Sequence, residues 1–177
     1  MEYNEQKFTE MLLYIAGKLS DDPAGGAVKL NKALHFSELV HMRLRGRPIT
    51  GAEYQKLPQG PAPRRLLPIR QHLIEDGAAV IEPSTYFGKV QYRLVPRREP
   101  DLSLFDDEEI AAIDEVVADL KGKSGAEVSA MSHREMGWFL TDDGETIEWE
   151  MAYLKPAVLT PEVREHARRL AAEHAVS

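Results

Sequence analysis

Three ionisable side chains that could share a metal ion or a proton lie close together in the sequence. His35, Glu38 and His41 occupy one largely apolar stretch at spacings of three residues. In a helix, a separation of six residues turns the second histidine about 120° away from the first, so the two rings do not converge on one ion. We therefore predict structural histidines here, satisfied or partly exposed, and no metal site.

The other candidate reactive groups lack the surroundings that a reaction needs. The chain has no cysteine, which excludes disulfides, thiolate metal ligands and a cysteine nucleophile. Gly25-Gly26 lacks the lysine and the strand of a phosphate-binding loop, and no serine has flanking glycines. His133 and Glu135 are two residues apart and point apart on a helix. We predict that the protein is not an enzyme and has no cofactor.

The hydrophobic spacing of the first half predicts three helices and then two strands. The second helix is apolar almost all round, which predicts a central, buried position, and Gly46 ends it. The connection over residues 48–63 is too rich in proline and glycine for a long regular element. The predicted elements are helices over 4–19, 27–45 and 66–76 and strands over 79–82 and 90–95.

Capping signals organise the second half. Three capping boxes predict helix starts, at Asp106 with Glu109, Ser124 with Glu127 and Ser132 with Glu135. The alternation of Ile147, Trp149 and Met151 with two glutamates predicts a short strand. Thr160-Pro161 predicts the start of a last helix.

Together these elements predict an α+β fold, a mostly helical single domain with a small β-hairpin and a short additional strand. The order of three helices and a hairpin makes the N-terminal half winged-helix-like. We place the domain at 5–153 and a C-terminal helical appendage at 154–177. The longest apolar run, Met11 to Ala16, is too short to span a bilayer, and the acidic N-terminus does not resemble a signal peptide, so we expect a cytoplasmic protein and no membrane partner.

Charge is distributed unevenly along the chain. The net charge is −7, but the segment from Arg43 to Arg98 holds eleven basic residues against four acids, while the rest holds eleven basic residues against 25 acids. A basic middle segment can bind an anionic partner, or it can pack against the acidic ends and be neutralised by them. We favour the second interpretation.

Several segments, in order, resemble one bacterial and phage family, the SocA-like Panacea domain of toxin–antitoxin systems. The resemblance extends over about 5–153. Two departures are His35, where an aromatic such as tyrosine is expected, and Gln59-Gly60, which lacks an aromatic before the glycine. The matching residues are Lys29–Phe36, Gly46–Gly51, Tyr54, Gly60–Pro63, Leu73–Gly77, Phe105–Glu109, Ser132-His133, Trp138, Ile147 and Trp149.

The resemblance implies an antitoxin that binds and neutralises a cognate toxin protein, usually the product of a neighbouring gene. Neutralisation can occur by masking the toxin or by delivering it to a cellular protease, and the sequence does not choose between them. The partner-binding residues that we expect are Lys29, Lys32, Phe36, Tyr54, Gly60, Pro61, His133 and Trp138.

Most of these residues also have a structural interpretation. Lys29 and Lys32 can form a contact strip with Phe36, or their stems can lie along a buried helix with the ammonium groups in water, which we favour. Gly60-Pro61 can shape a binding loop or a structural turn. Trp138 and Trp149 are more often core than interface residues.

The alternative function is a winged-helix-like DNA-binding regulator. Arg64, Arg65, Arg70 and Arg93 occupy the positions of a recognition helix and a wing in that topology. The acidic balance of the whole chain argues against it, because DNA affinity comes mostly from cationic charge. Nucleic acid is a partner only under this alternative.

Overall fold

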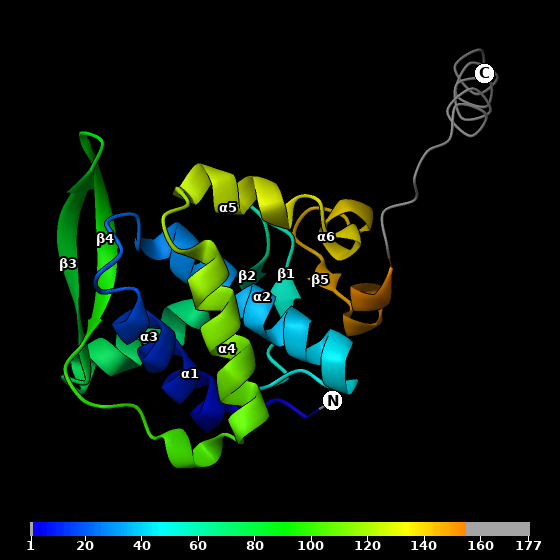
Figure 1. The fold of residues 1–177 in the computed structure, drawn as a ribbon, viewed down its shortest axis with the longest axis horizontal. Helices are drawn as coiled ribbons and strands as arrows, with labels where there is room; N and C mark the ends of the chain where they lie inside the picture. Colours follow the sequence, from blue (N-terminus) through cyan, green and yellow to red (C-terminus); the bar gives the residue numbers. More distant parts are fainter. Residues whose placement is uncertain (1, 155–177) are drawn as a thin grey trace.

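The structure is a computed structural model that describes residues 2–154 (Figure 1). Over these residues it is a mostly helical α+β fold, as the sequence predicts, and its strands form two small antiparallel sheets. The helices are α1 (Glu5–Lys18), α2 (Ala27–Arg45), α3 (Leu66–Glu75), α4 (Asp107–Leu120), α5 (Gly125–Ser132) and α6 (Met136–Leu140), with 3₁₀ turns η1 (Leu102–Leu104) and η2 (Trp149–Tyr153). The strands are β1 (Tyr54–Gln55), β2 (Ala62–Pro63), β3 (Ala79–Tyr86), β4 (Lys89–Pro96) and β5 (Thr146–Ile147).

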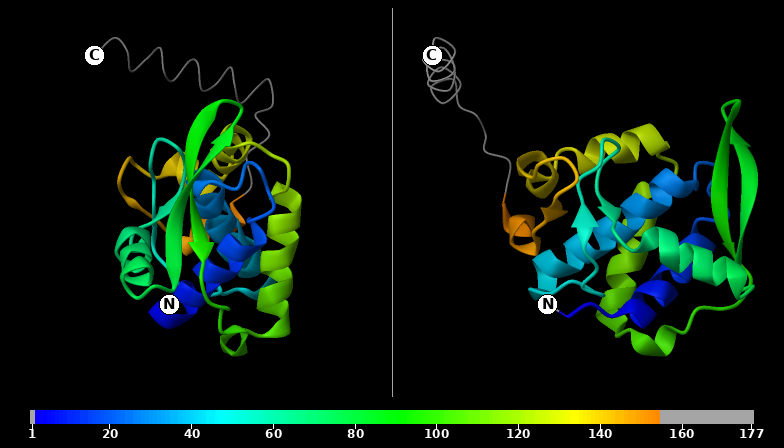
Figure 2. Two further views of the ribbon diagram at one scale, coloured as in Figure 1. Left: turned by 90° about the vertical axis from the view of Figure 1, so that its left-hand side faces the viewer. Right: turned by 180° about the vertical axis from the view of Figure 1, so that it is seen from behind.

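The long helix α2 runs through the middle of the molecule. It contacts α1, α4, α5, β2 and η2, and Figure 2 shows these elements around it from two further sides. Its apolar side chains join those of α1 and α4 in one core that includes Phe8, Leu34 and Ile113. The central position predicted from its nearly all-round apolarity is confirmed, and so is its end at Gly46, which has a left-handed φ of 75°.

Five buried polar side chains, spaced every third residue, lie along α2, and all of them except His35 are hydrogen-bonded to the surrounding loops. We call them the α2 polar row. Because three residues fall about 60° short of a full turn, the row winds around the helix and faces a different neighbour at each step. The members are Lys29, Lys32, His35, Glu38 and His41, each at most 3% exposed.

The strands β3 and β4 form a hairpin that stands at one end of the molecule (Figure 1). They pair from Ala79 with Pro96 to Tyr86 with Lys89, so both strands are longer than predicted. The turn is only two residues, Phe87 and Gly88, both with positive φ, at 46° and 73°. This conformation matches the twist of the strands and lets pairing continue to the tip.

The second sheet is small and lies at the other end of the molecule. Its strand order is β2-β1-β5, and the central residue Tyr54 pairs with Pro63 on one side and Ile147 on the other. The strand predicted over 147–151 is therefore wrong beyond Ile147, because the two-residue β1 offers no further backbone to pair with. Residues from Trp149 onward form the 3₁₀ turn η2 instead.

Two of the three predicted capping boxes are confirmed. Asp106 with Glu109 begins α4, and Ser124 with Glu127 begins α5. The box predicted at Ser132 is wrong, because Ser132 is the last residue of α5 and its hydroxyl donates to the carbonyl of Ser129. The next helix, α6, begins after Glu135.

The basic middle segment is neutralised by the acidic ends, as we favoured from the sequence. Ion pairs across this divide join Arg43 to Glu135, Arg45 to Glu108, Arg47 to Asp106 and Glu109, Lys56 to Asp143, Arg65 to Glu5 and Arg98 to Glu10. Most of them are partly exposed, so each contributes little to stability by itself. Together they engage six of the eleven basic residues of the segment.

Among residues 2–154, none of the helices combines the length and apolarity that crossing a membrane requires. The predicted appendage over 154–177, with the helix expected from Thr160, lies outside the described residues apart from Leu154.

Candidate functional site

Five of the predicted partner-binding residues come together where the loop after β1 meets α2 and the junction of α5 and α6. They are Lys32, Gly60, Pro61, His133 and Trp138. The Lys32 ammonium group is buried and donates a hydrogen bond of 2.9 Å to the carbonyl oxygen of Pro61. Burial lowers the pKa of Lys32 to about 8. The lysine is thus one end of an internal contact and does not reach water.

Gly60 sits tightly against this contact. Its φ of +99° is a conformation that glycine adopts without strain, and a Cβ atom there would lie 2.7 Å from the Lys32 Cε and also overlap the Ser132 hydroxyl. Gly60 and Pro61 are themselves buried. Of the two interpretations of Gly60-Pro61, the structural turn is the one that the structure supports.

The side chains that do reach the surface here form what we call the loop face, made of Lys56, Leu57, Pro58, His133 and Trp138. The rings of His133 and Trp138 stack at 4.0 Å with an interplanar angle of 18°. The Lys56 ammonium group lies 4.6 Å from the centre of the Trp138 ring, and the Trp138 indole N–H donates to the Leu57 carbonyl. The loop face therefore presents partly exposed aromatic rings in fixed positions beside a cation.

The remaining predicted residues lie away from the loop face. Lys29 is fully buried and forms an ion pair of 2.6 Å with Asp22, which is 4% exposed. Neither interpretation of the two lysines is therefore correct, because they form no surface strip and their ammonium groups do not reach water. Phe36 is 9% exposed, and Tyr54 is buried 5.0 Å from the ring of His35.

Three of the four arginines of the DNA-binding alternative are engaged within the chain. Arg64 donates to Gln55, Gly144 and Thr146. Arg65 pairs with Glu5, and Arg93 donates to the carbonyl oxygens of Ser20 and Asp22. Only Arg70 has no hydrogen bond or ion pair to another described residue. These contacts compete with phosphate binding, so the structure gives the alternative no support.

The histidines and the glutamate of α2 do not converge. Glu38 accepts hydrogen bonds from the backbone N–H groups of Ile49 and Thr50 and from the Thr50 hydroxyl. Burial raises the pKa of Glu38 to about 7, although these hydrogen bonds act in the opposite direction. Burial, together with the nearby charge of Lys32, lowers the pKa of His35 to about 3. Neither ring nitrogen of His35 has a hydrogen-bond partner among residues 2–154, so the prediction of a satisfied or partly exposed histidine is wrong there.

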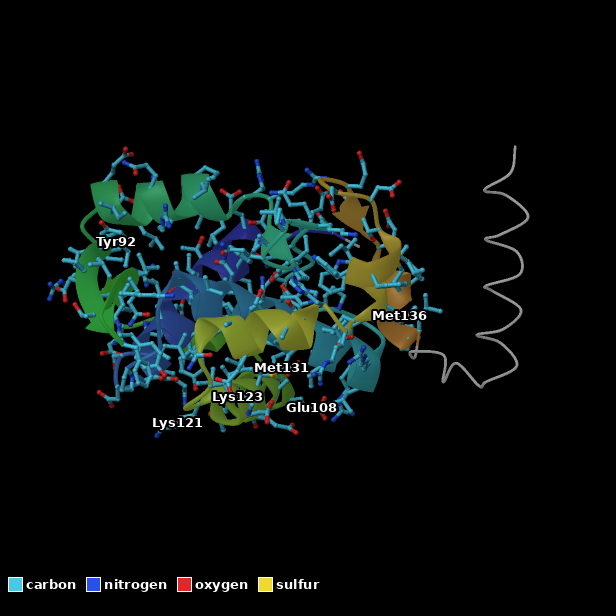
Figure 3. All side chains as sticks on the ribbon, turned by 90° about the horizontal axis from the view of Figure 1, so that it is seen from above. Tyr92, Glu108, Lys121, Lys123, Met131 and Met136 are labelled. Carbon is cyan, nitrogen blue, oxygen red and sulfur yellow. The ribbon has the colours of Figure 1, made fainter. Side chains whose placement is uncertain are left out.

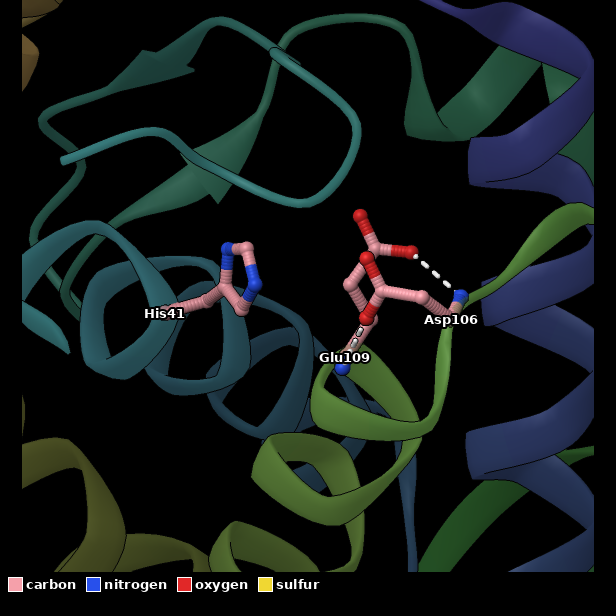
Figure 4. Close-up of side chains that lie close together, drawn as sticks. All are labelled: His41, Asp106 and Glu109. Atoms are coloured by element: carbon pink, nitrogen blue, oxygen red, sulfur yellow. Dashed lines mark hydrogen bonds between the residues drawn. The ribbon is translucent and has the colours of Figure 1, made fainter. Parts of the chain in front are cut away.

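A different trio, His41, Asp106 and Glu109, does converge, with potential ligand atoms within 4.8 Å of one another (Figure 4). The Glu109 carboxylate is already saturated. Lys7 donates to both of its oxygens at 2.7 and 2.6 Å, Arg47 donates to one at 3.2 Å, and the Asp106 backbone N–H donates to the other at 3.0 Å. Arg47 also pairs with Asp106. The two carboxylates belong to an ion-pair network that ties the start of α4 to α1 and to the loop after α2, and the trio gives no argument for a metal.

A cavity of about 510 Å³ opens between the small sheet and the start of α1. We call it the acidic cleft, because its rim carries Glu53 and Glu148, both exposed and without an ion pair among the described residues. Its walls include the aromatic rings of Tyr3, Phe8 and Trp149. The sequence analysis missed the cleft, because three segments distant in the chain build it, and only the alternation around Trp149 pointed to that part of it.

Comparison with known protein families gives a match over most of the chain. The family model described as the antitoxin SocA-like, Panacea domain matches residues 30–139, more than half of the chain. The matched region extends from α2 to α6 and contains the loop face. No curated protein and no solved structure matches the chain.

Proposed function

Since this chain belongs to the SocA-like antitoxin family with a Panacea domain, we propose that its antitoxin role consists of binding a cognate toxin protein and neutralising it. The family match over residues 30–139 is the observation that carries the proposal. The toxin is the product of a neighbouring gene, as the pairing of toxin and antitoxin genes implies. The proposal assigns the chain no chemical step, and binding alone accounts for its effect.

The loop face supports the proposal as the surface that contacts the toxin. Of the predicted partner-binding residues, His133 and Trp138 are the ones that reach the surface there. Tryptophan is enriched among the residues that dominate binding energy, and stacking holds Trp138 in one position before the partner arrives. Leu57 and Phe139, which are 36% and 65% exposed, add apolar area beside it.

The buried members of the predicted set act on binding through the loop face. Lys32, Gly60 and Pro61 fix the path of the loop that carries Lys56 and Leu57. We therefore assign them the positioning of the loop, and we assign toxin contact to the exposed residues.

Co-expression with the product of the neighbouring gene tests the proposal. The toxin alone should stop growth, and the intact chain should restore growth and co-purify with the toxin. The variant Leu57→Ser with Phe139→Ser should weaken the complex at least tenfold in a titration. The matched control is Tyr92→Ser with Val90→Ser, which removes apolar residues that are 60% and 65% exposed at the hairpin. A neighbouring product that is harmless when expressed alone contradicts the proposal.

The same experiment separates the two modes of neutralisation. If the chain masks the toxin, the amount of toxin in the cell stays constant while growth recovers. If the chain delivers the toxin to a protease, the toxin disappears in the presence of the chain and accumulates when that protease is removed.

A further inference from the structure

We propose that the acidic cleft receives a lysine or arginine side chain of the toxin, held between the carboxylates of Glu53 and Glu148 and the ring of Trp149. This inference rests on the proposed function, because it names a contact within the same complex.

The charge balance of the cleft favours a cation. Arg65 is the one basic residue among those that line it, and it is already paired with Glu5 at 2.7 Å. Glu53 and Glu148 remain without a basic partner among the described residues, in a chain where most ion pairs form between distant segments. Two like charges on one rim, with apolar walls between them, concentrate the field on a cationic ligand.

The aromatic wall favours a cation that also has an apolar stem. The ring of Trp149 meets that of Tyr54 edge to face at 5.7 Å and 79°, and Tyr54 is itself buried against His35, so the indole is held in place. The face of an indole ring attracts ammonium and guanidinium groups. Elsewhere in the same chain, Lys56 lies over Trp138, and inside the cleft the guanidinium group of Arg65 lies over the ring of Tyr3.

The position of the cleft makes the occupant a part of the toxin. Ile147, Glu148 and Trp149 line the cleft, and they also line a much smaller cavity that is bounded by Trp138 of the loop face. A protein bound on the loop face can therefore extend one side chain into the cleft. The volume of about 510 Å³ is within the range of sites that hold small ligands, so it admits such a side chain and some adjoining backbone.

The test compares two double variants of the full chain that change net charge equally. Glu53→Gln with Glu148→Gln removes the two unpaired negative charges of the cleft, and Glu99→Gln with Glu115→Gln removes two exposed carboxylates elsewhere that have no ion pair within residues 2–154. We expect the cleft variant to bind the toxin at least tenfold more weakly and the control to stay within twofold of the unchanged chain. Equal affinities of all three chains, or equal losses in both variants, overturn the inference and leave the proposed function intact.

A second measurement does not depend on the toxin. The probes are N-acetyl-arginine amide and its uncharged counterpart N-acetyl-norleucine amide, added at millimolar concentration. The readout is the indole N–H resonance of Trp149, assigned with the Trp149→Phe variant. A shift caused by the arginine probe alone, and lost in the cleft variant, supports the binding of a cationic side chain in the cleft independently of the toxin experiment. The absence of a shift, or an equal shift with both probes, overturns it.

A second copy of the chain is the remaining possible occupant of the cleft, and light scattering tests for it. A dimer of the unchanged chain that dissociates in the cleft variant shows that the cleft is filled by self-association, and this outcome also overturns the inference.

Discussion

The two ends of the molecule use charge in opposite ways. At the hairpin end, Arg93 donates to carbonyl groups of the turn before α2, and Arg97 pairs with Glu82 across the hairpin. At the other end, Glu53 and Glu148 face the acidic cleft without a partner among the described residues. Figure 3 marks the two ends by Tyr92 on the hairpin and Met136 on α6.

This difference shows that charge counted along the sequence does not predict charge available at the surface. The hairpin and α3 lie within the basic segment, yet most of the basic side chains there are used to hold the chain together. Arg70 and Lys89 are the basic side chains there without a hydrogen bond or ion pair to another described residue. At the cleft the unpaired charge is acidic, although Glu53 belongs to the same basic segment.

The largest loss of stability should follow from breaking the buried ion pair of Lys29 with Asp22 at the hairpin end. Lys29→Met leaves the buried carboxylate of Asp22 without its ammonium partner, and Arg93 is hydrogen-bonded to the carbonyl of the same residue. Removal of one member of a buried pair costs about 3–5 kcal/mol, so urea unfolding should show a loss of that size. The double variant Asp22→Asn with Lys29→Met should lose less than Lys29→Met alone. A loss below about 1 kcal/mol for Lys29→Met contradicts the buried pair, because that is the contribution of an ordinary exposed ion pair to stability.

The second largest effect is the difference in stability cost between substituting one glycine at each end of the molecule. Gly60→Ala at the loop end should lower the free energy of unfolding by about 2–3 kcal/mol, because it adds overlap with Lys32 and Ser132 to an unfavourable φ. Gly88→Ala in the hairpin turn also has a positive φ but has open space around it, so it should cost about 1 kcal/mol. Thermal unfolding of both variants measures the difference. Equal costs contradict the close approach at Gly60.

The third effect is the pH dependence of the α2 polar row, which lies between the two ends. From pH 4.5 to 7 the folded chain keeps a proton on Glu38 that the unfolded chain releases, so this residue makes stability fall as pH rises. From pH 3 to 6.5 the unfolded chain holds a proton on His35 that the folded chain does not, so this residue makes stability rise with pH. The two contributions oppose each other where their ranges overlap.

Single substitutions separate these two contributions. As the pH rises from 4.5 to 7, the stability of Glu38→Gln relative to the unchanged chain should increase by about 1–3 kcal/mol. As the pH rises from 3 to 6.5, the stability of His35→Phe relative to the unchanged chain should decrease. Urea unfolding at pH 3.5, 5 and 7.5 gives both differences. Differences that do not change with pH contradict the burial of these two groups.

The sequence predicted the local structure well where the signal is local. The capping boxes at Asp106 and Ser124 begin helices as expected, because a cap and its partner are three residues apart. The capping box predicted at Ser132 is absent, and Gly60, from a distant part of the chain, packs against that serine. The strand after Ile147 failed similarly, because its length depends on the length of β1.

The candidate site was less predictable than the fold. Trp138 and His133 were found through the resemblance, but their stacking depends on the bend between α5 and α6. Lys29 and Lys32 were expected to reach water, and the structure buries both. Their spacing of three, continued by His35, Glu38 and His41, is a signal in the sequence, although it does not reveal which loop each residue meets.

The sequence by itself determined the helices, the central place of α2 and the family of the chain, because these depend on periodicity, caps and ordered motifs that are local in the chain. Only the tertiary structure decided which charged side chains are paired within the chain and which are left unpaired. A charge is satisfied by whatever group lies within a few ångströms of it, and for Arg65 that group is Glu5, 60 residues away. For Glu53 and Glu148 the described part of the chain supplies no such group, and this leaves an acidic cleft that composition alone could not locate.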